Sequence, residues 1–140
     1  TRSTVVTATR GPTIKHGAVY KTNGTTKRGT VIAGRGGRTV KHGTVRKANG
    51  TTKRQTVLEG RHGQTAKHRT VRKANGTTKE GVSLTGRRGN SVKVGAVNKA
   101  DGTTKRGVSI KKGNTKVQVG TRKGSDGSNK AGIRIKTKGR

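Results

Sequence analysis

A 26-residue repeat fills this chain, and it constrains the fold more than any other feature of the sequence. Three full copies follow one another without gaps, and a fourth copy is one residue shorter near Gly113. Because a period of this length is typical of arrays built from one supersecondary unit, we expect a single repeat domain over residues 1–140. The half copy, the four full copies and the decayed last copy occupy residues 1–14, 15–40, 41–66, 67–92, 93–117 and 118–140.

Turn-forming residues recur in register within the repeat. Each full copy holds an Asn-Gly or Asp-Gly pair, which is the strongest short signal for a hairpin and predicts a type I′ turn with positive φ at both residues. A second glycine-rich turn signal lies halfway round each period, as in Gly60-Arg61-His62-Gly63. The pairs are Asn23-Gly24, Asn49-Gly50, Asn75-Gly76 and Asp101-Gly102.

The segments between these turns are rich in Thr and Val, whose branched side chains favour strands. Each repeat therefore predicts two strands of roughly 8–10 residues and two tight turns. No segment shows the 3.6-residue period of a helix. We expect an all-β fold, an antiparallel β-hairpin repeat that forms a meander or curled sheet of about ten or eleven strands.

The expected sheet is thin, because Lys and Arg occur on both faces of the predicted strands. A sparse aliphatic seam is predicted from the recurring residues Val19, Val31, Val45, Val57, Val71 and Val97. Glycine in the middle of a strand marks a bend, a bulge or a close approach of the backbone. Such features are predicted at Gly17, Gly29, Gly43, Gly81, Gly95 and Gly107.

A meander leaves two open edges, which suggests assembly. The segment Thr4–Thr9 is the least charged strand of the chain and is suited to pairing with the last strand of a neighbour, near Ile133–Ile135. Such head-to-tail pairing predicts a homo-oligomer or polymer. The alternative is that Thr4–Thr9 starts the sheet of its own chain.

Charge is the second constraint. The 140 residues include 35 Lys and Arg but only 4 Asp and Glu, so the formal net charge is +31, and only 23% of the residues are hydrophobic. Such a composition is typical of disorder, but turn residues held in register with Val and Lys indicate regular structure. We expect backbone pairing, neighbouring subunits and a polyanion to provide the stability, and the protein alone at low salt to be poorly folded or monomeric.

The favoured partner is DNA, bound without regard to sequence. The chain lacks a recognition helix, a zinc finger and an aromatic platform, since Tyr20 is its only aromatic residue. Contacts are expected from Lys and Arg to phosphate, assisted by the N–H groups of glycine-rich turns. The candidate residues are Lys21, Lys27, Arg28, Arg35, Lys47, Lys53, Arg54, Arg61, Lys73, Lys79, Arg87, Arg88, Lys99, Lys105 and Arg106.

This interpretation is a non-enzymatic protein that coats or packages DNA in a filament or sheath. Two alternatives share its chemistry. One is an extracellular matrix or surface fibre protein that binds an anionic polysaccharide, and the other is a virion protein that lines or decorates a capsid.

No catalytic site, cofactor or metal is expected. Asp101 and Asp126 occupy turn positions, and Glu59 and Glu80 stand in unrelated repeat positions, so no general acid–base pair can be assigned. The glycine-rich run at 34–37 is not followed by a helix, which argues against a nucleotide site. One repeat position holds a histidine in three copies and Val94 in the fourth, which favours a weakly basic strand position over a metal site. These histidines are His16, His42 and His68.

The runs that carry a resemblance to known proteins include Gly29-Thr30-Val31, Gly43-Thr44-Val45 and Ala48–Thr52. Through these runs the chain resembles the short-repeat, Thr/Gly-rich secreted β proteins of bacteria, a group of unknown function. The resemblance implies export and a β-rich repeat. We therefore expect an extracellular location, with a virion or nucleoid-associated location as the alternative. The start at Thr1 suggests removal of an initiator Met or a signal peptide. No apolar run reaches the roughly 18–20 residues of a membrane span.

Overall fold

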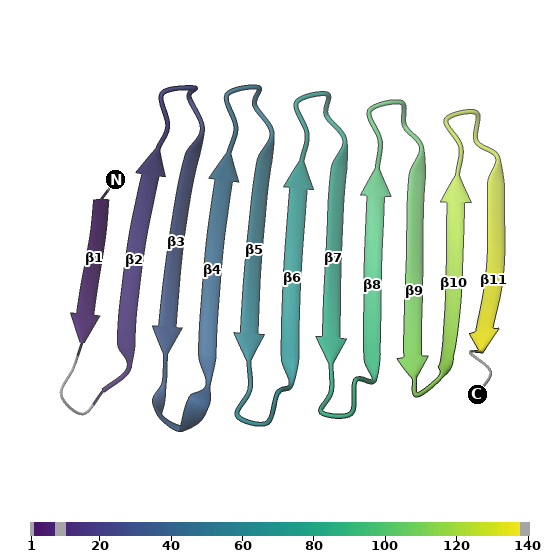
Figure 1. The fold of residues 1–140 in the computed structure, drawn as a ribbon. Helices are drawn as coiled ribbons and strands as arrows, with labels where there is room; N and C mark the ends of the chain where they lie inside the picture. The colour runs from purple at the N-terminus through teal and green to yellow at the C-terminus, as the bar shows by residue number, and fades with distance from the viewer. Residues whose placement is uncertain (1, 8–10, 138–140) are drawn as a thin grey trace.

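The computed structural model describes residues 2–7 and 11–137, and it forms one 11-stranded antiparallel sheet (Figure 1). The strands follow one another in sequence order, so each pairs with its neighbours along the chain. The predicted all-β meander is thereby confirmed. The sheet is open, with β1 and β11 at its two edges.

The strands are short and regular, as the spacing of the turn residues predicts. They are β1 (Arg2–Thr7), β2 (Thr13–Tyr20), β3 (Thr26–Ala33), β4 (Thr39–Arg46), β5 (Thr52–Glu59), β6 (Thr65–Arg72), β7 (Thr78–Thr85), β8 (Ser91–Asn98), β9 (Thr104–Lys112), β10 (Thr115–Lys123) and β11 (Asn129–Thr137). A single 3-10 turn, η1 (Arg35–Gly37), lies between β3 and β4.

The first strand is part of the chain's own sheet. β1 pairs with β2 in register from Arg2 opposite Ala18 to Thr7 opposite Thr13. This is the alternative predicted for Thr4–Thr9, whose residues 8 and 9 lie outside the described part. The outer edge of β1 is not used by this pairing.

The upper turns in Figure 1 contain the Asn-Gly pairs, but they are not type I′ turns. Gly24 N–H donates to the Lys21 carbonyl at 3.0 Å and Lys21 N–H donates to the Thr25 carbonyl at 2.9 Å, which encloses a three-residue loop. Gly24 has a φ of 74°, whereas no residue other than glycine has positive φ in the described ranges. This is a type I turn followed by a left-handed glycine. Asn23 contributes its side chain, whose Oδ1 accepts a hydrogen bond from Thr25 N–H at 3.1 Å.

Neighbouring upper turns touch one another. A Cβ on Gly24 would lie 3.2 Å from the Cβ of Ala48 in the next turn, and the Ala74 N–H donates to the Thr51 hydroxyl at 3.4 Å. Thr77 and Thr103, at the end of such turns, are two of the few buried residues of the described chain. The repeat period therefore stacks the turns as well as pairing the strands.

Two lower turns, at 60–64 and 86–90, follow the same rule, whereas the turn at 34–38 has positive φ at both Gly36 and Gly37. Gly63 N–H donates to the Gly60 carbonyl at 3.2 Å, again with positive φ at the glycine. Between β9 and β10, Thr115 pairs with Lys112, so only Gly113 and Asn114 remain in the loop. The shorter fourth repeat is thus accommodated by a two-residue turn with a positive φ at its first residue.

In-register pairing sorts the side chains into rows that run across the strands, because residues directly opposite one another share a face. Mid-strand glycines form one such row, in which Gly17 faces Gly29 and Gly29 faces Gly43. The predicted bulges are absent from β2–β11, where pairing is continuous through every glycine. A Cβ at Gly81 would lie 3.3 Å from the Val94 carbonyl oxygen, so close backbone approach is the feature that remains.

The predicted aliphatic seam is wrong, because its residues do not adjoin. Val19 lies opposite Lys27, and Lys27 lies opposite Val45. A continuous aliphatic row exists instead on the other face, where Ile14 pairs with Ile32 and Ile32 with Val40. From β5 to β11 the same row continues through Leu58, Ala66, Leu84, Val92, Ile110, Val117 and Ile135.

A second aliphatic row appears only in the C-terminal half of that face. Its members on β7–β11 are Val82, Val94, Val108, Val119 and Ile133. In β2–β6 the same row alternates His and Thr, beginning with His16 opposite Thr30. We call the two rows together, over β7–β11, the aliphatic band. Ala18 is the only buried apolar residue within 11–137, so this part of the single-layer sheet has no enclosed core.

The left-handed glycines yield a test of the turn geometry. Gly24→Ala places a Cβ at positive φ and against Ala48, so we expect the free energy of unfolding to fall by about 1–2 kcal/mol. Gly132→Ala is the matched control, since Gly132 has no positive φ and nothing within 4 Å of an added Cβ. We expect a change of less than about 0.5 kcal/mol there. Urea denaturation checks both, and equal losses would contradict the assigned turn.

Candidate polyanion-binding surface

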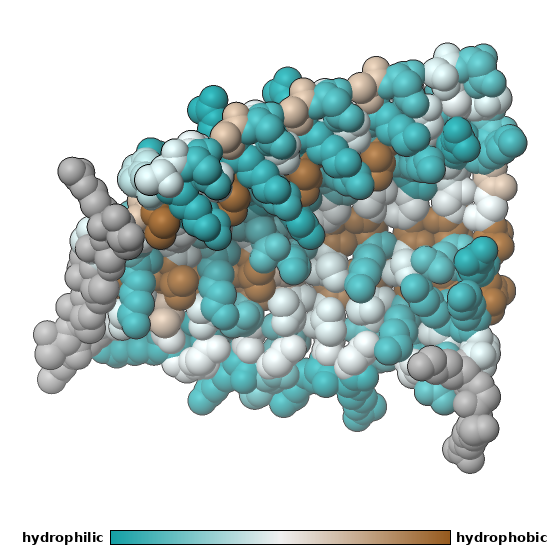
Figure 2. All heavy atoms as spheres, turned by 45° about the horizontal axis from the view of Figure 1, so that its top comes forward, coloured by the Kyte–Doolittle hydropathy of each residue, from teal (hydrophilic) through white to brown (hydrophobic). Residues whose placement is uncertain are grey.

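One face of the sheet carries more of the lysines and arginines of strands β2–β11 than the other, and we call it the basic face. Nearest the upper turns it holds the upper lysine row, in which lysines alternate with valines before the row ends at Arg122 and Lys130. Figure 2 shows this row as hydrophobic spheres alternating with long hydrophilic side chains. Its lysines are Lys27, Lys53, Lys79 and Lys105.

A lower lysine row lies on the same face, four residues further along each strand. Since strands rise by about 3.3 Å per residue and lie about 4.8 Å apart, the two rows are about 13 Å apart and lysines within a row recur every 10 Å or so. The rows are staggered, because the lower lysines stand on even-numbered strands and the upper ones on odd-numbered strands. The lower lysines are Lys15, Lys41, Lys67 and Lys93.

The glycine row runs between the two lysine rows, and at its β8–β11 end it forms the floor of a shallow groove. Over β8–β11 this groove is lined by Gly95, Gly107, Gly120 and Gly132, with Lys93 and Arg134 among the side chains along its edge. In the middle of the sheet the floor is interrupted, because Gln55 and Arg69 oppose one another in place of glycines. Lysines therefore recur along the whole basic face, whereas side chains at Gln55 and Arg69 interrupt the row of glycines.

The opposite face carries aliphatic, polar and basic side chains together. Arg28 lies there beside Tyr20, with Nη2 donating to the tyrosine hydroxyl at 3.2 Å and the guanidinium 5.9 Å from the ring centroid. The histidine position predicted as weakly basic lies on this face too. His16 Nδ1 and the Thr30 hydroxyl are hydrogen-bonded at 2.8 Å, and His42 Nδ1 bonds Thr56 in the same way at 2.9 Å. Since histidines stand on alternate strands with Thr between them, they do not adjoin.

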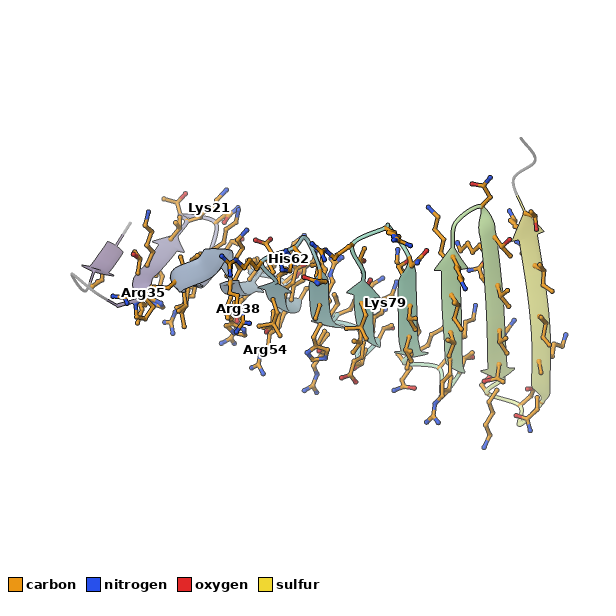
Figure 3. The ribbon with its side chains drawn as sticks, turned by 90° about the horizontal axis from the view of Figure 1, so that it is seen from below. Lys21, Arg35, Arg38, Arg54, His62 and Lys79 are labelled. Carbon is orange, nitrogen blue, oxygen red and sulfur yellow. The ribbon has the colours of Figure 1, made fainter. Side chains whose placement is uncertain are left out.

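The predicted contact residues do not form one site. Figure 3 shows basic side chains leaving the ribbon on both sides. The upper lysine row lies on the basic face, whereas the predicted strand arginines Arg28, Arg54 and Arg106 lie on the opposite face. The turn residues lie at the two ends of the strands. Those at the upper turns are Lys21, Lys47, Lys73 and Lys99, and those at the lower turns are Arg35, Arg61, Arg87 and Arg88.

The lower lysine row was missing from the predicted contact set. Its signal was present in the sequence, since these lysines occupy the same position in four consecutive repeats. Lys41 is the one member held by an acidic partner, with Nζ 2.9 Å from both carboxylate oxygens of Glu59. Further basic residues of this face come from the last strands and are Lys111, Lys116, Arg122, Lys130, Arg134 and Lys136.

The carboxylates are all engaged locally. Glu80 Oε1 lies 3.1 Å from His68 Nε2. In the upper turns, Asp101 Oδ1 accepts a hydrogen bond from Thr103 N–H at 2.8 Å, and Asp126 Oδ1 accepts from Ser128 N–H at 3.0 Å. These aspartates fill the place that Asn takes in the other upper turns, which agrees with their predicted role as turn formers.

The hydrogen bonds to the turn aspartates make the stability of the fold depend on pH. The Thr103 N–H holds the pKa of Asp101 below its ordinary value, because the bond favours the charged carboxylate. A carboxyl with a lower pKa in the folded state stabilises the fold above its unfolded pKa of about 4, and that contribution disappears as the pH falls through the folded value. We expect wild type to lose more stability than Asp101→Asn between pH 5 and pH 2 in urea denaturation. Parallel curves would contradict this role.

The described residues hold no group of three or more His, Cys, Asp or Glu side chains arranged to bind a metal ion. Within the same ranges, no helix has the length and apolar character needed to cross a membrane. Comparisons of the chain with protein-family models, with curated proteins and with solved structures found no match. The function must therefore be inferred from the surface itself.

Proposed function

We propose that this chain is a non-enzymatic protein that binds polyanions without regard to sequence and coats DNA through its basic face. The observation that carries the proposal is the register of the two lysine rows on one side of the sheet. Because the sequence repeats, the lysines recur at regular distances along each row, which suits a polyanion such as DNA whose phosphates also recur regularly.

The rows run across the strands, so a bound polyanion would lie perpendicular to them. Nine spacings of about 4.8 Å separate β2 from β11, which gives a charged track of about 43 Å. Duplex DNA carries one charge per roughly 1.7 Å of axis, so the track matches about 25 phosphates, or some 13 base pairs. Such contacts to phosphate position the protein and read no sequence.

Titration of a 30-base-pair duplex at increasing NaCl tests the proposal by fluorescence anisotropy. Binding through many lysines predicts a steep linear fall of log K against log salt, with a slope of about −0.9 for each phosphate contacted. Two unrelated duplex sequences should bind equally. An affinity that does not change with NaCl concentration, or a marked preference for one duplex sequence, would overturn the proposal.

Competition separates DNA from the other polyanions that share its chemistry. We expect duplex DNA to displace a fluorescent anionic polysaccharide at matched charge concentration, because the DNA backbone presents its phosphates at higher linear density. The reverse order would favour the polysaccharide-binding alternative. Electron microscopy of the complex would distinguish a coated filament from a closed shell, the mark of the virion alternative.

A further inference from the structure

We propose that two copies of this chain pack face to face through their aliphatic bands, forming a two-layered dimer with both basic faces outward. The band has no cover within one chain, since the sheet is a single layer (Figure 3). All but one of its ten residues are exposed, from 38% at Val108 to 73% at Ile133. Aliphatic side chains so exposed gain free energy when another apolar surface removes them from water.

The band is the contiguous apolar centre of a larger face. It continues into a hollow at the lower end of the sheet, lined by Leu58, Ala66 and Leu84 among others. The two rows of the band cover roughly 320 Å², since five strands lie about 4.8 Å apart and two rows span about 13 Å along them, and the whole β7–β11 face covers roughly 650 Å². A contact over the whole face, with the band at its centre and polar rows at its rim, approaches the roughly 800 Å² that each partner contributes to a standard stable interface. Two sheets packed in this way lie about 10 Å apart, the usual separation in a β-sandwich.

Charge identifies the occupant as a second copy. The two rows of the band contain no charged residue, whereas the basic face of the same strands carries lysines and arginines without a carboxylate. The row that borders the band toward the upper turns holds Ala96, Thr121 and Ala131 together with one acidic and one basic residue, Glu80 and Arg106. An uncharged band bordered by one charge of each sign suits an isologous two-fold contact, whereas a strongly basic or acidic partner would gain no net attraction there.

The dimer and the polyanion contact respond to salt in opposite directions. Two chains of net charge +31 repel one another, and salt screens this repulsion. Dimerisation should therefore tighten as NaCl rises, while DNA binding weakens. Failure of one proposal is thus distinguishable from failure of the other.

Sedimentation equilibrium of the full chain tests the dimer. At 1 M NaCl and about 50 μM protein we expect twice the monomer mass of 14.7 kDa, with a dissociation constant at least about tenfold higher at 0.05 M NaCl, where charges are screened less. A wild-type protein that stays monomeric at 1 M NaCl overturns the proposal without any variant. So does a monomer that instead sediments with neutral phosphatidylcholine vesicles, which would assign the band to a lipid surface.

Matched variants locate the contact. A triple variant of the band should raise the dissociation constant of the dimer at least about 100-fold, because each new hydroxyl would be buried in an apolar contact. It carries Val82→Thr, Val94→Thr and Val108→Thr. The fold should tolerate them, since Thr30 and Thr56 already occupy this row. The control carries Val45→Thr, Val71→Thr and Val97→Thr on the basic face and should dimerise like wild type. A dimer that survives the first set, or is lost in the second, contradicts packing through the band.

Discussion

Replacing the four lysines of the upper lysine row with glutamine will reduce DNA affinity by roughly three orders of magnitude at 0.1 M salt. Each lost phosphate contact removes about 0.9 from the slope of log K against log salt, so four contacts change the slope by about 3.6. The measurement is anisotropy of a labelled duplex at several NaCl concentrations. The variant carries Lys27→Gln, Lys53→Gln, Lys79→Gln and Lys105→Gln.

A variant of equal charge on the opposite face is the control. It removes four arginines whose side chains lie on that face, through Arg28→Gln, Arg54→Gln, Arg72→Gln and Arg106→Gln. Both variants have the same net charge, so a general electrostatic attraction would weaken them alike. We expect the control to retain affinity within about tenfold of wild type, because long-range attraction is screened beyond about 10 Å at 0.1 M salt. Equal losses would show that the basic face is not the contact surface.

A polyanion will raise the melting temperature of this protein strongly at low salt. A ligand at 100 times its dissociation constant that binds only the folded chain adds about 2.7 kcal/mol, or roughly 5–10 °C for a chain of this length. Inorganic polyphosphate is a suitable probe in scanning calorimetry. The physical reason is the net charge of +31 on a chain whose only buried apolar residue within 11–137 is Ala18.

Salt alone will act in the same direction through a different cause. Raising NaCl from 0.01 M to 0.5 M screens the repulsion between lysines of one row, which recur only about 10 Å apart, so the free protein should melt at higher temperature. At 0.5 M NaCl the polyphosphate effect should vanish, because its binding is itself screened. Dextran, an uncharged polymer, should have no effect at either salt concentration. A high melting temperature that is insensitive to salt and polyphosphate would contradict both expectations.

Much of the fold was accessible from local sequence signals. Thr- and Val-rich segments between glycine turns determine where strands begin and end, and the strands observed from Thr13 to Thr137 follow that spacing. The missing residue near Gly113 appears as one shorter turn. The candidate site was only partly accessible. Lys27 and Arg28 adjoin in sequence and were predicted together, yet alternation along β3 sends them to opposite faces.

The repeat by itself determined the class of fold, the number of strands and the charge that each strand carries, because turn chemistry and β propensity act over a few residues. Only the assembled sheet decided which columns of the repeat become neighbours. A two-residue turn at Asn23-Gly24 would have set Val19 opposite Arg28, whereas the three-residue loop sets it opposite Lys27. A shift of one residue moves every side chain to the other face. The loop length therefore decides that Ile14 meets Ile32 in a continuous aliphatic row and that the lysines share the face behind it.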